Sequence, residues 1–400
     1  LDEAARLDHL AKEVLDLSNK DLCASDGCVV AGWLPHCIGT INTLKLGGNP
    51  SLFGTGGNWQ ALFDAIEQVE LTSIDLAGTG MGVDASKALA DCLQQAALKG
   101  SLTNLDVSSN PLRMGKKSIF DALEGTNVLT LTVNLGSDEA AALDATAASV
   151  ELCDKDLEPD DAALLSGWIT HIREKLTLVE LSDNPSLVGE TAKSSASEFE
   201  HTFQALCDAL STAPVSTLRI DNTSLGPISC GLLATAVSDA QSLIRLDIGR
   251  NADLLGTGSA TNWRNLCKAC VGSKLEHLAV NECGLSPSAV QQGLAEVVGQ
   301  RIKGLDLSGN QVFGPFEDRW QGSGASSDAD MAGWNALCAA MHPKTKKSKC
   351  ALEELVCSEI GMGAHGLLAL ADALPQRLRK LDLSGNDIAS RALVRVKALK

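Results

Sequence analysis

The sequence predicts an α/β solenoid, in which copies of one strand–turn–helix unit stack into a parallel sheet with helices on one side. Three observations support this fold class. A short apolar pattern recurs along nearly the whole chain, alanine- and leucine-rich segments at helical spacing follow most copies, and glycine occupies the turns between them. One strand and one helix cannot bury their apolar sides alone, whereas stacked copies can.

The recurring pattern is apolar-x-x-apolar-x-apolar-x-x-Asn (or a small residue), as in INTLKLGGN, SLTNLDVSSN and RLRKLDLSGN. We count about thirteen repeats at a mean spacing of about 30 residues, the upper edge of known leucine-containing repeat lengths. Alternation of apolar and polar residues predicts a strand in which every second side chain points inward. The central inward residues are Leu15, Leu44, Ile74, Leu105, Leu129, Val150, Val179, Leu218, Leu246, Leu278, Leu305, Leu355 and Leu381.

The last position of the pattern alternates between asparagine and other residues, regularly so from Asn184 onward. The asparagines are Asn49, Asn110, Asn184, Asn251, Asn310 and Asn386, and the intervening repeats have Thr79, Thr223, Cys283 and Ile360. An inward asparagine can hydrogen-bond the backbone groups that a tight turn leaves unpaired, so we expect a structural role for this column.

These repeats resemble the leucine-rich-repeat family, and within it the ribonuclease-inhibitor-like subclass, whose long helical repeats alternate between two types. The resemblance covers nearly the whole chain. It implies a right-handed solenoid, shaped as a horseshoe or arc, with the parallel sheet on the concave face and the helices on the convex face. We therefore expect residues 1–400 to form a single leucine-rich-repeat solenoid.

A larger duplication is superimposed on the repeats. The segment KDLCASDGCVVAGWLPH matches KDLEPDDAALLSGWITH, and NPSL recurs in the same two blocks, at about 14–52 and 149–187. Between them, the repeats at about 127–148 are short and irregular, which predicts a defect in the solenoid or a domain boundary. A long insertion at about 313–333 is rich in Gly, Ser and Asp, and a loop of this length is either functional or flexible filler.

Both ends of the sequence lie close to full repeats. Leu1 and Lys400 leave little sequence for the polar caps that exposed terminal repeats normally need. We therefore expect the chain to be part of a longer protein, or its ends to dock on neighbours.

Composition narrows the class of partner. The chain has 50 acidic and 33 basic residues and a net charge of -17, which opposes nucleic-acid binding and favours a basic protein partner. No apolar stretch approaches the roughly 18 residues of a membrane helix, so we expect no direct membrane insertion. The 13 scattered cysteines predict reduced thiols in an intracellular compartment such as the cytoplasm, without indicating the organelle.

Three motifs have a chemical interpretation and a structural alternative. GMGAHG (361–366) fits the dinucleotide-binding form G-x-G-x-x-G, but equivalent glycines in other repeats favour a simple strand-to-helix bend. Cys267 and Cys270 have the spacing of half a zinc site, but both columns are apolar in other repeats. An aromatic column at the helix entrance predicts an internal packing spine, formed by Trp59, Phe203, Trp263 and Trp334. We expect no metal, no cofactor and no catalytic residue.

The most informative column lies between the two inward residues and points outward, onto the predicted concave face. It comprises Asp16, Lys45, Asp75, Asp106, Thr130, Glu151, Glu180, Arg219, Asp247, Ala279, Asp306, Val356 and Asp382, of which eight are acidic. Neighbouring strands lie about 4.8 Å apart, so these carboxylates would form a dense ladder that attracts a basic partner. Aspartate is also the ordinary residue of this column across leucine-rich repeats, so the ladder is either a binding face or the repeat consensus.

We predict a non-catalytic protein–protein interaction module that binds a partner through its acidic concave face and rim loops. Phe316 and Trp320 of the insertion are the expected apolar anchors. One alternative is a regulator of a small GTPase, by resemblance to Ran GTPase-activating proteins, which share this repeat subclass and act through polar residues near strand ends. No residue of this chain can be matched to them. The other alternative is a structural subunit that docks within a larger complex.

Overall fold

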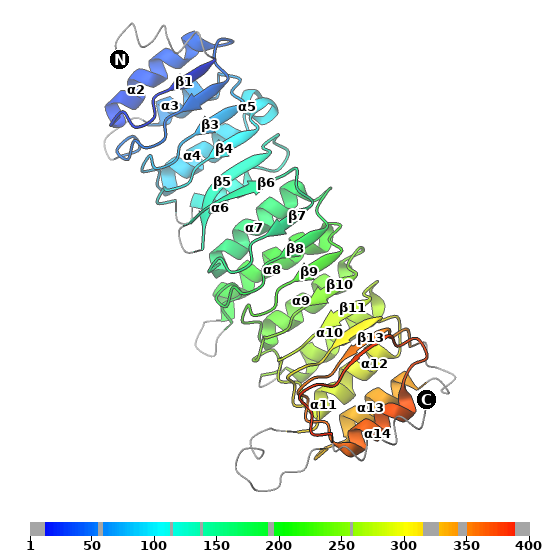
Figure 1. Cartoon of the computed structure of the whole chain (residues 1–400). Coiled ribbons are helices and arrows are strands. Elements are labelled where there is room, and N and C mark those ends of the chain that lie inside the picture. Colours follow the sequence, from blue (N-terminus) through cyan, green and yellow to red (C-terminus); the bar gives the residue numbers. More distant parts are fainter. Residues whose placement is uncertain are drawn as a thin grey trace. The chain divides into compact units, whose positions relative to one another are not determined.

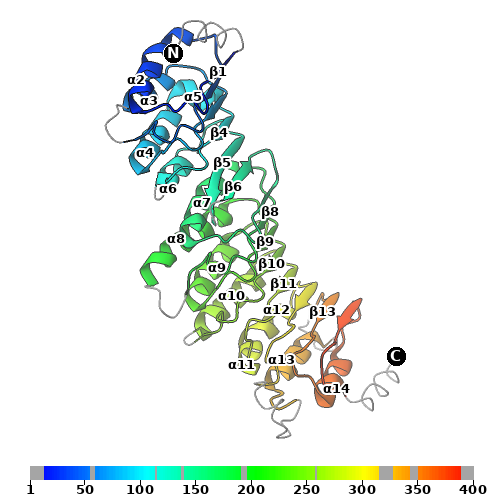
Figure 2. The same cartoon turned by 60° about the vertical axis from the view of Figure 1, so that its left-hand side comes forward.

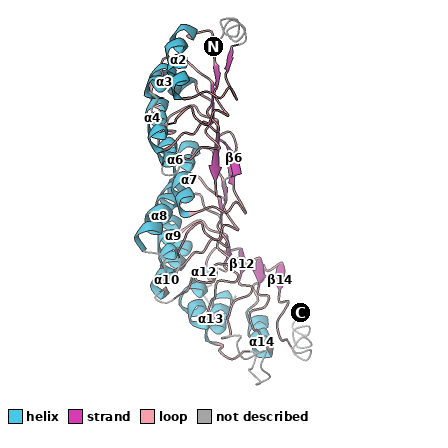
Figure 3. Ribbon diagram, turned by 90° about the vertical axis from the view of Figure 1, so that its left-hand side faces the viewer, coloured by secondary structure: helices cyan, strands magenta, loops and turns pink. Residues whose placement is uncertain are grey.

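The chain folds into two compact units, each a stack of strand–turn–helix repeats. They comprise Leu1–Val150 with Lys155–Leu176, and Glu151–Asp154 with Thr177–Lys400. In both units the helices form one layer and the strands the other (Figures 1 and 3). The computed structural model describes residues 13–54, 59–112, 115–136, 139–190, 196–256, 259–314, 328–342 and 350–388. The α/β repeat solenoid expected from the sequence is confirmed, while one continuous solenoid over residues 1–400 stays a prediction.

The first unit contains a six-stranded sheet whose strands follow sequence order. Its strands are β1 (Val14–Asp16), β2 (Thr43–Lys45), β3 (Ser73–Asp75), β4 (Asn104–Asp106), β5 (Thr130–Leu135) and β6 (Glu139–Asp144). Strands β1 to β5 are parallel, whereas β6 folds back onto β5 as an antiparallel hairpin. The helices are α2 (Ala24–Trp33), η1 (Leu34–Cys37), α3 (Trp59–Ile66), α4 (Val83–Leu93), α5 (Ala96–Ser101), α6 (Gly115–Asp121) and α7 (Pro159–Ile172).

The second sheet has eight strands, again in sequence order. They are β7 (Ser149–Glu151), β8 (Leu178–Glu180), β9 (Thr217–Arg219), β10 (Arg245–Asp247), β11 (His277–Ala279), β12 (Gly304–Asp306), β13 (Glu354–Val356) and β14 (Lys380–Asp382). The helices are α8 (Ala196–Thr212), α9 (Pro227–Asp239), α10 (Ala260–Gly272), α11 (Pro287–Ala289), the π-helical η2 (Val290–Leu294), α12 (Ala295–Val298), α13 (Ala332–Met341) and α14 (Ala364–Ala373). Among the described helices, none has both the length and the apolar character needed to cross a membrane.

The irregular segment between the duplicated blocks forms the β5–β6 hairpin, and its register differs from the sequence prediction. Leu131, not Leu129, pairs with Leu105 of β4 and is fully buried, while Leu129 is 41% exposed. The outward residue of this repeat is therefore Thr132 rather than Thr130. The prediction was wrong because Leu-Thr-Leu-Thr alternates identically in both frames, and a shift of two residues leaves the inward and outward faces unchanged.

The core lies between the strand and helix layers and contains the predicted aromatic spine. Phe203, Trp263 and Trp334 are buried, and Trp59 is half-buried. The indole Nε1 of Trp263 donates to the Ala289 carbonyl oxygen at 3.0 Å, and that of Trp334 donates to the Gly366 carbonyl oxygen at 2.9 Å. Each indole thus packs in its own repeat and hydrogen-bonds the next helix, which confirms the structural interpretation.

The two cysteines of the CKAC motif also belong to the core. Cys267 and Cys270 are both 2% exposed, and burial raises the pKa of the Cys270 thiol to about 12. A thiol held neutral in an apolar environment behaves as a small hydrophobic side chain. None of the thirteen cysteines, all of which lie within the described residues, takes part in a disulfide.

The turn asparagines hydrogen-bond two successive repeats at once. The Oδ1 of Asn310 accepts from the backbone N–H groups of Cys283 and Leu285 in the preceding repeat, at 3.0 and 2.9 Å. Its Nδ2 donates to the carbonyl oxygens of Val280 and Leu307, both at 2.8 Å, in the preceding repeat and its own. The same pattern recurs at Asn49, Asn110, Asn251 and Asn386.

This geometry explains the alternation of repeat types. Because one asparagine serves the turns of two repeats, the preceding repeat needs no second amide in its own turn. There, a shorter side chain completes the turn, as when the Thr223 hydroxyl donates to the Ile220 carbonyl oxygen at 2.8 Å. The structural role expected for this column is therefore confirmed.

We predict that Asn310→Ala will lower the free energy of unfolding by about 3 kcal/mol, since it leaves several buried backbone groups in two repeats without a hydrogen-bond partner. Cys283→Ala, in the same column of the preceding repeat, should cost about 1 kcal/mol, because Asn310 continues to bind that turn. Urea unfolding followed by circular dichroism measures both. Equal losses would contradict the shared role of the asparagine.

Candidate functional site

The strand face is defined as the side of each sheet opposite its helices, which cover the other side in each unit (Figure 2). The outward column of each unit lies on this face. In the first unit the register places Asp16, Lys45, Asp75, Asp106 and Thr132 side by side. In the second unit the corresponding row is Glu180, Arg219, Asp247, Ala279, Asp306, Val356 and Asp382. Glu151, the last residue of β7, is exposed.

The carboxylates of this column have a structural role that the sequence did not reveal. In seven of the eight, one oxygen accepts the backbone N–H of the residue two positions later, where the strand ends. The distance is 2.9 Å at Asp75, Asp106, Asp306 and Asp382, 3.0 Å at Asp16, and 3.2 Å at Glu180 and Asp247. Acidic residues therefore recur here partly because a side-chain acceptor closes the turn. The same hydrogen bond also fixes the orientation of the carboxylate.

In the second unit, an arginine of the column neutralises part of the acidic row. The Arg219 guanidinium lies 2.7 Å from a Glu180 oxygen and 3.8 Å from an Asp247 oxygen. These three residues are neighbours on adjacent strands, where opposite charges stabilise the pairing. The ladder is therefore not uniformly available to a partner.

In the first unit, the column keeps more of its negative charge. Lys45 lies between Asp16 and Asp75, and within the described residues no ion pair involves Asp75 or Asp106. Burial raises the pKa of the Asp75 carboxyl, and the nearby Asp106 and Asp16 add to this effect. Like charges thus repel one another along this row.

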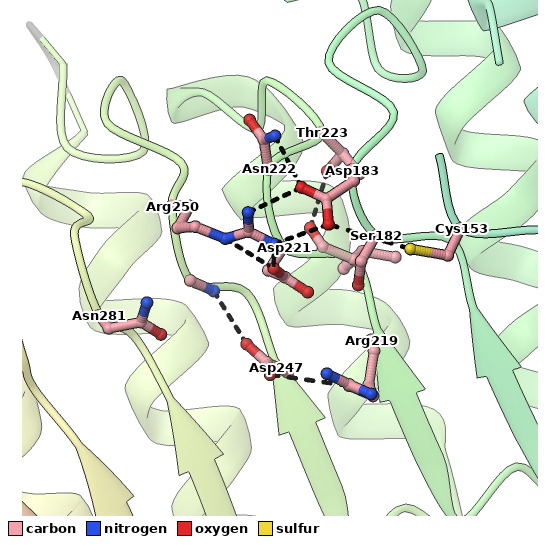
Figure 4. Close-up of polar contacts among 12 residues, drawn as sticks. Cys153, Ser182, Asp183, Arg219, Asp221, Asn222, Thr223, Asp247, Arg250 and Asn281 are labelled. Atoms are coloured by element: carbon pink, nitrogen blue, oxygen red, sulfur yellow. Dashed lines mark hydrogen bonds and ion pairs between the residues drawn. The ribbon is translucent and has the colours of Figure 1, made fainter. Parts of the chain in front are cut away.

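A polar cluster lies at the ends of strands β8 to β10 (Figure 4). The Arg250 guanidinium binds both oxygens of Asp183, at 2.7 and 3.1 Å, and also binds Asp221. The Asn222 amide donates to Asp183 at 2.9 Å. These bonds hold the Asp183 pKa below its usual range. Sequence reasoning missed the cluster because its members come from three repeats and three of them, Asp183, Asn222 and Arg250, occupy left-handed turn positions.

The strand face of the second unit also contains a groove of about 630 Å³ that is lined by residues of strands β8 to β14. Its floor is formed by the small residues Ala279 and Gly304 on neighbouring strands. Charged side chains surround this floor, among them Asp247, Asp306 and Arg245. The column was predicted from the sequence, but the groove depends on which residues of adjacent repeats are small.

The GMGAHG motif forms a bend whose following helix end is already occupied. Gly361 has a φ of 87°, a left-handed conformation that glycine adopts without strain. At the start of α14, the Asp328 carboxylate accepts from the N–H groups of Gly363, His365 and Gly366, at 2.7, 2.8 and 3.1 Å. A phosphate would have to displace this carboxylate, so the geometry favours the structural interpretation. Phe316 and Trp320 lie outside the described residues, and their role as anchors stays a prediction.

Opposite pKa shifts in the column predict opposite responses to charge removal. The raised pKa of Asp75 means that ionisation disfavours the folded state, so stability declines as the pH rises through this pKa. The hydrogen bonds from Ser384 lower the pKa of Asp382, so its contribution to stability is present at neutral pH and lost on acidification. We expect Asp75→Asn to raise the melting temperature at pH 7 and Asp382→Asn to lower it.

The Asp75 difference should vanish below about pH 3, where this carboxyl is protonated in the folded and unfolded states, and the Asp382 difference should shrink as the pH falls through the lowered pKa of Asp382. Asparagine keeps an acceptor for the turn, so the comparison isolates charge. Scanning calorimetry between pH 3 and pH 8 measures these shifts, and effects of the same sign at pH 7 would contradict the assignment.

Comparison with known proteins gives matches of limited extent. Residues 376–394 match the family model described as Leucine Rich repeat. The chain is similar to a chain in the crystal structure of the Rad7 and Elc1 complex in yeast, with 14% identity, a TM-score of 0.40, and coverage of 100% of this chain and 80% of that chain. It is also similar to the leucine-rich-repeat-containing protein LegL7 from Legionella pneumophila, with 15% identity, a TM-score of 0.34, and coverage of 92% and 93%. No curated protein matches.

The matched segment contains RLRKLDLSGN, within which Lys380–Asp382 form strand β14. Inward aliphatic residues recur in the other parallel strands of both units, and the turn asparagine recurs in some of the repeats. Assignment to the ribonuclease-inhibitor-like subclass stays a prediction. The match to the family model thus covers one repeat, in a chain whose strand pattern recurs along both units.

Proposed function

We propose that this chain is a non-catalytic protein-binding module whose strand face binds a basic segment of a partner. One observation supports this most directly. In the first unit, Asp16, Asp75 and Asp106 share a column whose only cation is Lys45, and the turn hydrogen bonds fix the orientation of the three carboxylates. Preset carboxylates lose little conformational entropy when a cation binds.

The small free energy of each ion pair favours a binding mode in which several weak contacts act together. A partly exposed ion pair contributes about 0.2–1 kcal/mol, so a single carboxylate gives little affinity. Carboxylates on adjacent strands can contact successive basic residues of one extended segment, and their contributions then combine. Because such contacts are partly solvated, we expect the affinity to decrease as the salt concentration rises.

The proposal does not need every acidic residue of the column. Glu180 and Asp247 are partly neutralised by Arg219, so we expect them to contribute less than Asp75 and Asp106. In the second sheet, Glu151 remains a candidate contact, and Asp382 is assigned none. Lys45 would disfavour a cation placed directly above it and so helps to set the spacing of the basic residues.

We predict that the double variant Asp75→Asn/Asp106→Asn will bind a ten-residue alternating Lys-Ala peptide about 10-fold more weakly than the unmodified chain. Asparagine preserves the turn acceptor, so the circular-dichroism spectrum should not change. Fluorescence anisotropy at low salt measures the affinity. Cross-linking mass spectrometry of the native complex would then show whether a natural partner contacts the same strands.

The matched control is Asp121→Asn/Glu124→Gln, which removes the same charge from the first unit, at and just after the end of α6. We expect this control to change the affinity less than 2-fold at about 0.15 M salt, where charges more than about 8 Å away are screened. If both double variants weaken binding equally, net charge rather than the strand face attracts the peptide, and the proposal is wrong.

The cluster of Figure 4 favours a second candidate, a regulator of a small GTPase, because it places polar side chains at strand ends. Resemblance to Ran GTPase-activating proteins implies functional residues in that region. Arg250 is the residue to test, since its guanidinium is 38% exposed. Single-turnover GTP hydrolysis with candidate GTPases should be faster with the unmodified chain than with Arg250→Gln. No acceleration by the unmodified chain would exclude this candidate for the GTPases tested.

A further inference from the structure

The groove on the second unit has two small residues in its floor, Ala279 and Gly304. On the neighbouring strands β11 and β12, Ala279 pairs with Asp306 and Gly304 pairs with His277. A Cβ on Gly304 would lie 2.4 Å from Nδ1 of His277, which real Cβ atoms do not tolerate. The His277 ring therefore occupies the space that a side chain at position 304 would need, so the backbone of Gly304 lies below the side chains around it.

Two carboxylates stand on either side of Ala279. The register aligns Asp247 with Ala279 and Ala279 with Asp306, so the two aspartates lie two strand spacings apart, about 10 Å between backbones. Each has one oxygen tied to its turn, to the N–H of Gly249 at 3.2 Å and that of Ser308 at 2.9 Å. Both carboxylates are thus oriented before any ligand arrives.

Three cations also line the groove, Arg219, Arg245 and Lys380, but within the described residues Asp306 forms no ion pair and Asp247 forms only a long one. Burial raises the pKa of Asp247, and the carboxylates of Asp221 and Asp306 raise it further. The Arg219 guanidinium lies 3.8 Å from Asp247 but only 2.7 Å from Glu180, so its principal partner is Glu180. Asp221 is itself paired with Arg250.

We propose that this groove binds an arginine side chain of the protein partner, with the guanidinium above Ala279 between Asp247 and Asp306. This deepens the proposed function and rests on it, because it names one anchor residue of the partner. A guanidinium has donors on opposite edges and can bind both carboxylates, whereas an ammonium is a compact point charge. Its flat, weakly hydrated faces also suit a floor of Ala279 and Gly304, with Val356 beside it.

The test uses a minimal probe, N-acetyl-arginine amide, titrated into the full chain with methyl-labelled alanine and valine. We expect saturable shifts of the Ala279 and Val356 methyl resonances, with a Kd of about 1–10 mM for a single charged side chain. The citrulline analogue has nearly the same shape without the charge and should bind at least 5-fold more weakly. The lysine analogue should also bind more weakly than arginine.

Three variants test the assignment. Asp306→Asn keeps the turn acceptor and should raise the Kd about 5-fold, while Ala279→Leu fills the floor and should abolish the Val356 shift. Asp382→Asn removes a carboxylate from the same column outside the groove, and its Kd should stay within about 2-fold of the unmodified chain. This control has the same type of turn hydrogen bond, so a general effect of the substitution would appear in it.

The inference is overturned if no saturable shift occurs up to about 50 mM probe, if citrulline or a glutamate analogue binds as tightly as arginine, or if Asp382→Asn matches Asp306→Asn. The proposed function can fail separately, because its test concerns Asp75 and Asp106 of the first unit. If the unmodified chain does not bind the lysine peptide but does bind the arginine probe in the groove, only the proposal for the strand face of the first unit fails.

Discussion

The side-chain amide of the turn asparagine is the interaction on which the arrangement of each unit depends. Asn49 accepts from the N–H groups of Lys20 and Leu22 and donates to the carbonyl oxygens of Leu17 and Leu46, so it fixes two strand ends at once. Because these groups are buried, leaving them unpaired would cost several kcal/mol. The amide therefore sets the spacing of the turns, and through them the positions of the side chains on the strand face.

The outward carboxylates extend the same principle to the surface. Seven of the eight use one oxygen to close their own turn, which makes these residues useful to the fold whether or not a partner binds. The acidic column can therefore follow the repeat consensus and also bind a partner. The residues next to each carboxylate differ from repeat to repeat. Arg219 forms an ion pair with Glu180, whereas the small Ala279 leaves an open position between Asp247 and Asp306.

The charge pattern therefore divides the strand face into distinct surfaces. The column of the first unit is acidic with one lysine, and that of the second unit combines ion pairs with a groove. Away from the strand face, carboxylates serve the fold. Glu190 accepts from the N–H groups of Gly226, Ile228 and Ser229 at the start of α9, just as Asp328 does at α14. Net charge alone therefore overstates the negative charge that a partner would meet.

The sequence by itself determined the repeat, the strand–turn–helix order, the buried aromatic spine and the column of outward residues, because these follow from local periodicity. It assigned the Leu129 repeat wrongly, since a shift of two residues preserves the alternation. Only the tertiary structure decided the β5–β6 hairpin, the pairing of Arg219 and the cluster around Arg250. The pairing of Arg219 and the cluster around Arg250 depend on contacts between residues about 30 or more positions apart, which side chains reach only after the repeats have stacked. The hairpin pairs residues that are close in sequence, but the alternation of this segment does not determine its register.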